Sequence, residues 1–314
     1  MFYAIVFVLL GLALLTLGAE GLVRAGVSFA LRMGVTPLVI GLTIVAFGTG
    51  SPELVVSAQA SYFGNSGLAL GNVIGSNISN TALILGVASL IFPITAHTDV
   101  VRREMPIMVA VTGALWLMIA DGELGRVDGV ILFTGSIAYT TTIYFLARRS
   151  NIHITVSPIP DEDQEPGNSI VLDTVYLIGG LAILVAGAKL LIDGAISIAR
   201  ILEISEVIIA LSVVAIGTSL PELATSAVAA IRKESDLALG NAIGSNIFNI
   251  LCVLGVTALV NPVSAAEIRN FDMAVLMGSA LFLWALLGFR FRLDRFEGAL
   301  LLVGYAIYLY TLAP

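Results

Sequence analysis

The sequence predicts an all-α integral membrane protein of ten transmembrane helices, organised as two inverted five-helix repeats. The first reason is composition: hydrophobic residues make up 58% of the 314 residues and charged residues only 12%, with a mean hydropathy of +1.01. Soluble domains carry about 25% charged residues. The other reasons are a set of long apolar runs and an internal repeat. No stretch resembles a soluble catalytic or nucleic-acid-binding domain. We therefore expect the chain to lie in a lipid bilayer and to bind no nucleic acid.

Ten apolar runs, each bounded by charges, proline or glycine, are the expected spans. Runs of about 20 residues are typical of membrane helices. The first and sixth runs are longer than a span needs, so these two helices should be strongly tilted. No basic segment of the kind that begins a signal peptide precedes the first run, which we interpret as a retained span. The runs cover residues 2–31, 37–62, 67–92, 104–121, 127–147, 170–200, 206–231, 236–260, 270–289 and 296–312.

The segment 148–169 separates the runs into two groups of five. It holds three prolines and the acidic residues Asp161, Glu162, Asp163 and Glu165, a composition typical of a solvated linker. We therefore expect a first repeat over residues 1–147, an acidic linker over 148–169 and a second repeat over 170–314.

The two groups are copies of one another. With a constant shift of 169, residues 41–86 and 210–255 are identical at 25 of 46 positions without a gap. An odd number of spans in each copy means that the second copy enters the membrane from the opposite side. Inverted repeats of this kind are typical of secondary transporters, whose binding site lies at the repeat interface near the middle of the membrane.

The placement of Lys and Arg predicts the orientation. With the N-terminus outside, the cytoplasmic loops carry ten basic residues and the outer loops carry only Arg126, Arg200 and Arg269. This asymmetry agrees with the positive-inside rule. We expect a multi-pass protein of the cell (plasma) membrane with both termini extracellular and the linker cytoplasmic. The ten cytoplasmic residues are Arg32, Arg102, Arg103, Arg148, Arg149, Arg232, Lys233, Arg290, Arg292 and Arg295.

Two motifs occur once in each half and carry the chemistry. The first is Gly-Thr-Gly-Ser-Pro-Glu at 48–53 and Gly-Thr-Ser-Leu-Pro-Glu at 217–222, each ending on a glutamate inside an expected span. A carboxylate at that depth is costly and indicates a functional site by default. The prolines, Pro52 and Pro221, release backbone carbonyls one turn earlier. The second motif, rich in Gly, Ser and Asn, covers residues 71–80 and 240–249.

Together these motifs supply carboxylate, hydroxyl, amide and carbonyl oxygens. Such hard ligands suit sodium and calcium, not zinc or copper. The two histidines, His97 and His153, fall in loops, and Cys252 is interpreted as core packing. One buried glutamate alone is compatible with a structural acid, but two in matching positions favour a shared site for a positive charge.

Other polar residues have simpler interpretations. Four asparagines of the second motif are expected to be hydrogen bonders between helices, and two serines are expected to bond carbonyls of their own helices. Two charge pairs spaced by four residues are interpreted as local ion pairs, with a gate as the alternative. The residues are Asn72, Asn77, Asn241 and Asn246, then Ser57 and Ser226, then Glu20 with Arg24 and Lys189 with Asp193.

At these motifs the chain resembles the cation/calcium antiporter superfamily, in particular its prokaryotic sodium/calcium exchangers, over essentially its whole length. The resemblance implies that Glu53 and Glu222 are the central ligands for calcium and sodium. It also implies that helices one and six slide over the other eight, and that about three sodium ions exchange for one calcium ion. The remaining implied ligands are Thr49, Thr218, Ser219, Ser76, Ser245, Asn80 and Asn249, with the carbonyls of Ala46 and Ala215.

The sequence departs from the family pattern at two places. Gly50 and Ser51 stand where the second copy has Ser219 and Leu220, so a hydroxyl is lost and one sodium site is expected to be weakened or rebuilt with water. Position 249 is Asn, where some exchangers have Asp. Two glutamates alone neutralise one calcium ion and leave three sodium ions with one positive charge, which is consistent with electrogenic exchange.

The leading hypothesis is therefore an alternating-access antiporter that exports calcium against sodium. Proton- or potassium-coupled exchange is the first alternative, and a cation channel of the same architecture is the second. A hydrolase with Ser219 or Ser51 as nucleophile lacks a base near those residues. We expect no enzymatic activity, no cofactor beyond the transported calcium and sodium ions, and no obligatory protein partner.

Overall fold

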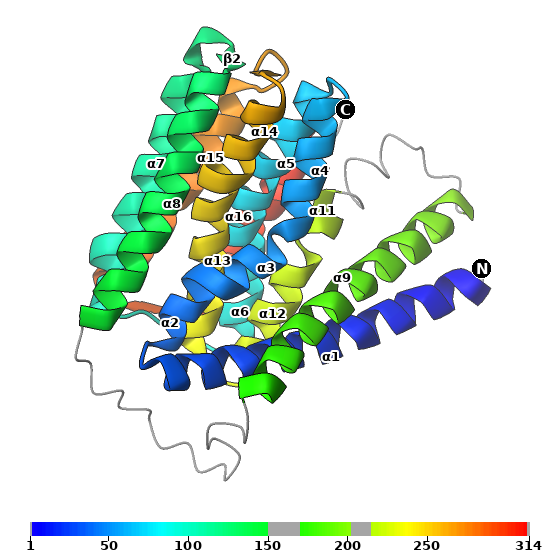
Figure 1. Cartoon of the computed structure of the whole chain (residues 1–314). Helices are drawn as coiled ribbons and strands as arrows, with labels where there is room; N and C mark the ends of the chain where they lie inside the picture. The colour runs from blue at the N-terminus through cyan, green and yellow to red at the C-terminus, as the bar shows by residue number, and fades with distance from the viewer. Residues whose placement is uncertain (1, 150–169, 202–214, 313–314) are drawn as a thin grey trace.

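A computed structural model describes residues 2–149, 170–201 and 215–312, and almost all of them are helical (Figure 1). The first half contains α1 (Phe2–Met33), α2 (Pro37–Ile40), the π-helix η1 (Gly41–Val45), α3 (Ala46–Thr49), α4 (Ser51–Tyr62), α5 (Ser66–Ser79), the π-helix η2 (Asn80–Ile84), α6 (Leu85–Ile91), the π-helix η3 (Val100–Glu104), α7 (Met105–Met118), the 3-10 helix η4 (Ile119–Asp121) and α8 (Arg126–Arg149). The second half contains α9 (Ile170–Ile201), α11 (Ala215–Thr218), α12 (Leu220–Ile231), α13 (Ser235–Phe248), the π-helix η6 (Asn249–Leu254), α14 (Gly255–Val260), α15 (Asn270–Arg290) and α16 (Arg295–Leu312).

The helices follow the predicted apolar runs, and the chain is a multi-span membrane protein. Within the described ranges, seven helices are long and apolar enough to cross a membrane, or eight if the bent pair 37–49 and 51–62 is one span. The predicted linker begins two residues too early, because α8 continues through Arg148 and Arg149. The rest of that linker, 150–169, and the start of the seventh predicted run, 206–214, lie outside the described residues.

Two helices break at equivalent points. Residues 37–49 and 51–62 meet at an angle of 45°, and the residue at the break, Gly50, has φ −79° and ψ 1°. Ser219 has nearly the same conformation, with φ −86° and ψ 6°, before α12. Proline is the second residue of both α4 and α12. Because proline has no N–H and clashes with the preceding turn, it ends one helix and starts the next.

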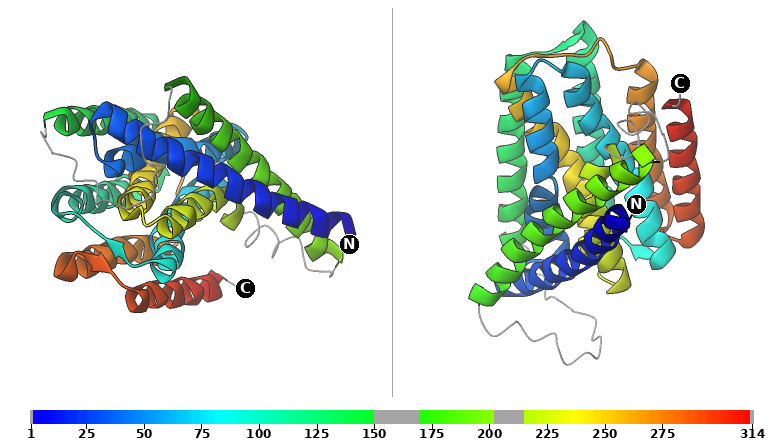
Figure 2. Two further views of the ribbon diagram at one scale, coloured as in Figure 1. Left: turned by 90° about the horizontal axis from the view of Figure 1, so that it is seen from below. Right: turned by 90° about the vertical axis from the view of Figure 1, so that its right-hand side faces the viewer.

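The two longest helices, α1 and α9, pair with each other and lie obliquely across the others (Figures 1 and 2). Their contact is made by backbone, because glycines face glycines. A Cβ at Gly18 would stand 2.7 Å from the Gly180 carbonyl oxygen, and one at Gly187 would stand 3.0 Å from the Gly11 carbonyl oxygen. Small residues allow such close approach of membrane helices. The oblique placement agrees with the tilt predicted from their length.

The centre of the molecule is formed by the α5–η2–α6 and α13–η6–α14 segments. The most apolar windows of these two segments are 72% and 78% buried, against 28% for α1 and 22% for α9. Every residue of α13 from Leu237 to Ile247 is buried. A helix that is buried on all faces needs no polar stripe, so its polar residues must find partners inside the protein.

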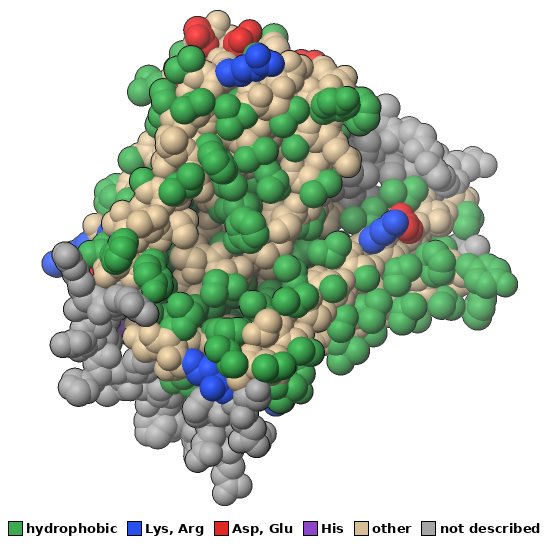
Figure 3. Space-filling view, viewed as in Figure 1, with side chains coloured by type: hydrophobic (Ala, Val, Ile, Leu, Met, Phe, Trp, Pro, Cys, Tyr) green, Lys and Arg blue, Asp and Glu red, His purple; other side chains and the backbone are tan. Residues whose placement is uncertain are grey.

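The loops gather at two opposite ends. At one end β1 (Ile94–Thr95) pairs with β4 (Arg292–Leu293), and at the other β2 (Glu123–Leu124) pairs with β3 (Val263–Ser264), both antiparallel. The sequence did not predict these short strands. Each ladder joins loops that the predicted topology places on the same side of the membrane. Hydrophobic side chains cover the region between the ends, and most charged ones lie at the ends (Figure 3).

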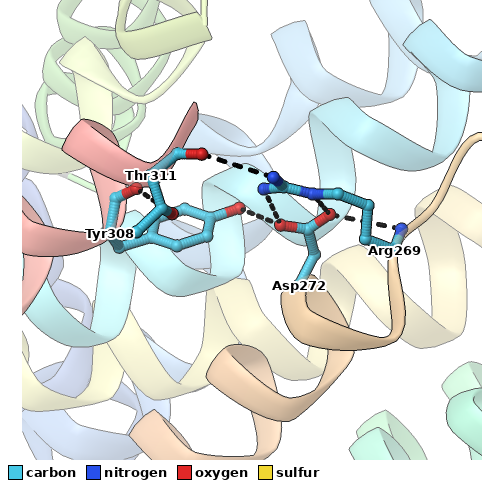
Figure 4. Close-up of polar contacts among 4 residues, drawn as sticks. All are labelled: Arg269, Asp272, Tyr308 and Thr311. Atoms are coloured by element: carbon cyan, nitrogen blue, oxygen red, sulfur yellow. Dashed lines mark hydrogen bonds and ion pairs between the residues drawn. The ribbon is translucent and has the colours of Figure 1, made fainter. Parts of the chain in front are cut away.

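Charged residues near the ends tie helices together. The Asp272 carboxylate of α15 accepts hydrogen bonds from Arg269 Nη2 at 2.7 Å and from the Tyr308 hydroxyl at 3.3 Å, and Arg269 also donates to the Thr311 carbonyl oxygen (Figure 4). The predicted ion pair of Glu20 within α1 is wrong. Glu20 pairs instead with Arg232, which ends α12, because α12 packs against α1.

Candidate ion-binding site

Glu53 and Glu222 lie in the first turns of α4 and α12, where the two broken helices restart. Their side chains are fully buried, at 0% and 1% exposure. The positive end of a helix dipole favours a carboxylate at such a position. Yet among the residues that the structure describes, none of the four carboxylate oxygens has a hydrogen-bond partner. Buried charges without partners are strongly unfavourable, which makes the pair a candidate site for a cation.

The surroundings of the two glutamates are unequal. The hydroxyls of Thr218, Ser219 and Ser76 face the Glu53 carboxylate, although none is close enough for a normal hydrogen bond. The hydroxyl of Thr49 faces Glu222, and the two carboxylates lie close to each other. The structure thus brings together the predicted carboxylates and most of the predicted hydroxyls from both halves.

One asparagine in each half holds the site together. Asn72 on α5 donates from Nδ2 to the Ser57 hydroxyl oxygen at 2.9 Å and to the Glu53 carbonyl oxygen at 3.4 Å. Its Oδ1 accepts from the Thr218 hydroxyl at 3.3 Å. One amide therefore links α4, α5 and α11, which confirms the interpretation of Asn72 as a hydrogen bonder between helices. Ser57 is a partner of that amide, a role that the sequence did not predict.

The same contacts recur 169 residues along the chain. Asn241 on α13 donates to the Ser226 hydroxyl oxygen at 3.0 Å and to the Glu222 carbonyl oxygen at 3.3 Å. Its Oδ1 lies 3.2 Å from the Thr49 hydroxyl oxygen, which also lies 3.1 Å from the Val45 carbonyl oxygen. A hydroxyl that donates to these acceptors keeps its lone pairs available for a cation.

Further asparagines form hydrogen bonds between the two central segments of the molecule. Asn77 Nδ2 donates to the Asn246 carbonyl oxygen at 3.1 Å, and Asn249 Nδ2 donates to Asn77 Oδ1 at 3.0 Å. Asn246 Nδ2 donates to the Thr81 hydroxyl oxygen at 2.8 Å. These bonds join the two central helices, as expected for Asn77 and Asn246.

Asn80 and Asn249 begin the π-helices η2 and η6. Single π turns occur often at functional sites, and no sequence signal had indicated them. Among the described parts of the chain, both amide atoms of Asn80 and the Oδ1 atom of Asn249 are buried without a partner, and so is the hydroxyl of Ser245. These free oxygens are available to a cation.

The remaining predicted ligands are less well defined. The Ala46 carbonyl oxygen accepts the Gly50 amide at 3.0 Å, which leaves one lone pair. Ala215, whose carbonyl is the equivalent predicted ligand, is the first residue of α11. The Ser51 hydroxyl donates to the Phe47 carbonyl oxygen of the preceding turn at 2.8 Å. Within the described ranges, no group of three or more His, Cys, Asp or Glu side chains could hold a metal ion.

Comparison with known proteins identifies relatives over the whole chain. The family model described as sodium/calcium exchanger protein matches residues 3–145 and 172–313. The putative antiporter CaxA of Alkalimonas amylolytica is 39% identical over 99% of both chains. The sodium/calcium exchanger MaX1 of Methanosarcina acetivorans is 32% identical over 97% of both chains. A solved structure of the sodium-calcium exchanger NCX_Mj superimposes with a TM-score of 0.86, at 34% identity and 99% coverage of both chains.

Proposed function

The chain belongs to the sodium/calcium exchanger family, and we propose that it is an antiporter that exchanges calcium for sodium at the site between Glu53 and Glu222. One observation carries this proposal: four buried carboxylate oxygens without partners face hydroxyls from the opposite half. A calcium ion balances both carboxylates. Sodium ions compete for the same negative charge, so loading with one ion disfavours the other.

The proposed architecture is two inverted five-helix repeats, ten spans in all, related by the 169-residue shift. The equivalent hydrogen bonds of Asn72 and Asn241 and the equivalent helix breaks at Gly50 and Ser219 support it. Broken helices at a repeat interface are the arrangement in which secondary transporters bind ions. The peripheral α1–α9 pair is the element that we propose to move over the others during alternating access. No cofactor and no protein partner enter the proposed cycle.

The exchange is tested in proteoliposomes that are loaded with calcium, with external sodium, potassium and pH varied independently. Calcium efflux should follow the inward sodium gradient and stop when sodium is absent from the outside. Efflux that ignores sodium but follows a pH step or a potassium gradient would identify a different coupling ion. A steady calcium conductance without any counter-ion would identify a channel.

The proposed orientation places the protein in the plasma membrane with both termini outside and residues 150–169 in the cytoplasm. The segregation of β1–β4 and β2–β3 to opposite ends supports the predicted loop sides. In a Cys252→Ser background, a single cysteine at Ser169 should react with a membrane-impermeant maleimide only after the cells are opened. A cysteine at Asp121, in the loop with β2, should react in intact cells. The reversed pattern would invert the topology.

A further inference from the structure

The two halves of the site differ at one pair of positions. Ser219 and Ser79 occupy these positions on one side, and the 169-residue shift places Gly50 and Phe248 at the same positions on the other. Ser219 is thus replaced by Gly50 at one position, and Ser79 is replaced by the aromatic Phe248 at the other. The difference falls directly beside the predicted ion ligands.

The ring of Phe248 explains the glycine. Gly50 has the backbone conformation of Ser219, so the local dihedral angles do not require glycine. A Cβ atom at Gly50 would stand 2.9 Å from the Ala46 carbonyl oxygen of the preceding turn, and 2.9 Å and 3.0 Å from the Cδ1 and Cε1 atoms of Phe248. Because Ser219 carries a Cβ atom at nearly the same dihedral angles, the ring is the contact that distinguishes position 50. Contacts this short are repulsive, so no larger side chain fits at position 50 while the ring stays in place. The ring is held by Phe47, which it meets edge-to-face with ring centroids 5.2 Å apart.

The substitution removes an oxygen from one half of the site. On the Glu53 side the Ser219 hydroxyl donates to the Ser76 hydroxyl oxygen at 3.2 Å, and both serines face the carboxylate together with Thr218. On the Glu222 side Thr49 faces the carboxylate.

The equivalent of Ser76 on the Glu222 side is Ser245. Its buried hydroxyl has no hydrogen-bond partner within the described ranges, and Gly50 has no side chain that could provide one.

We propose that the Gly50–Phe248 contact removes a sodium position from the Glu222 half of the site, so that sodium binds on the Glu53 side. This inference rests on the proposed sodium/calcium exchange. A singly charged hard cation needs several neutral oxygens besides a carboxylate, and the Glu222 half has one hydroxyl fewer than the Glu53 half. The apolar ring also occupies the space in which a water molecule would replace the missing hydroxyl. Calcium is less affected, because both carboxylates hold it.

The proposed asymmetry changes the coupling. For each calcium ion, the chain transports one sodium ion fewer than an exchanger in which both halves of the site are complete. Rebuilding of the lost site with water, one of the two outcomes expected from the sequence, is disfavoured by the position of the ring.

The test converts the Glu222 half into a copy of the Glu53 half. The double variant Gly50→Ser/Phe248→Ser carries the residues found at the equivalent positions, and Phe248→Ser alone is its matched control for loss of the ring. We expect the double variant to gain a steeper sodium dependence of calcium flux and a higher sodium-to-calcium ratio, measured from the calcium gradient that a fixed sodium gradient sustains when net flux stops. The single Phe248→Ser variant should gain less than the double variant, because water can enter the vacated space but the hydroxyl at position 50 is still missing. Gly50→Ser alone should show no gain, because the ring blocks the hydroxyl.

Calcium binding by calorimetry, measured on each purified variant, reports whether the site remains folded. If the double variant does not bind calcium, Ser219→Gly carries the test, since it should lower the apparent sodium affinity severalfold and by more than it lowers the calcium affinity. The same sodium dependence in wild type, the double variant and Ser219→Gly would overturn the inference. Wild-type calcium flux without any sodium dependence would instead overturn the proposed function.

Discussion

Glu53→Gln or Glu222→Gln should abolish exchange and leave the protein folded. Each change removes one of the two charges that hold calcium, while the amide keeps the size of the carboxylate. Loss of one partner from a buried charge pair costs about 2–5 kcal/mol, so calcium affinity should fall on the order of 100-fold or more. The ion-free protein should be as stable as wild type or more stable, because an unpaired buried charge has been removed.

The matched control is Glu104→Gln. Glu104 is also fully buried, but it is paired, since it accepts from Arg103 Nε at 2.6 Å and from the Tyr139 hydroxyl at 2.8 Å. Its amide should lower thermal stability and leave calcium affinity unchanged, which is the opposite pattern. Calcium calorimetry and a thermal melt without ions measure both quantities on each variant. Wild-type calcium affinity in either site variant would contradict the site assignment.

Gly18→Ala should loosen the α1–α9 pair and slow exchange. The added Cβ would stand 2.7 Å from the Gly180 carbonyl oxygen and 2.7 Å from the Leu184 amide nitrogen. Backbone atoms cannot rotate aside as a side chain can, so the helices must separate. Such overpacking costs about 1–3 kcal/mol. If the pair moves as one body during transport, the calcium flux should fall together with the melting temperature.

Gly21→Ala, on the same helix, is the control. Its Cβ would stand 3.5 Å from the nearest atom, the Tyr176 carbonyl oxygen, which is an ordinary contact. Melting temperature and calcium flux should stay close to wild type. Equal melting temperatures for the two variants would show that α1 and α9 do not depend on the close glycine contact.

Much of the candidate site was predictable because a carboxylate inside an apolar run has few structural explanations. Glu53 and Glu222 stand out from the sequence alone, and the 169-residue shift joins them into one site. The ion pair of Glu20 with Arg232 was not predictable, because the two residues are 212 positions apart. A pair spaced by four residues is visible on a single helix, whereas a partner on another helix depends on how the helices pack. The strands β1 to β4 were missed for a different reason: each has only two residues, which is too short for a pattern of alternating side chains to be visible in the sequence.

The sequence by itself determined that this is a membrane protein, most of its helical runs, the duplication and the candidate ion ligands. The length of an apolar run, a proline within it and a charged residue within it are local features of the sequence. They can therefore be recognised before the tertiary structure is known. Only the tertiary structure decided how the two copies differ where they meet. The loss of a hydroxyl at Gly50 is visible in the sequence, but its cause is the ring of Phe248, which the fold brings from another helix into the space of a Cβ atom. Packing of atoms from distant segments sets that contact, and no pattern along the chain records it.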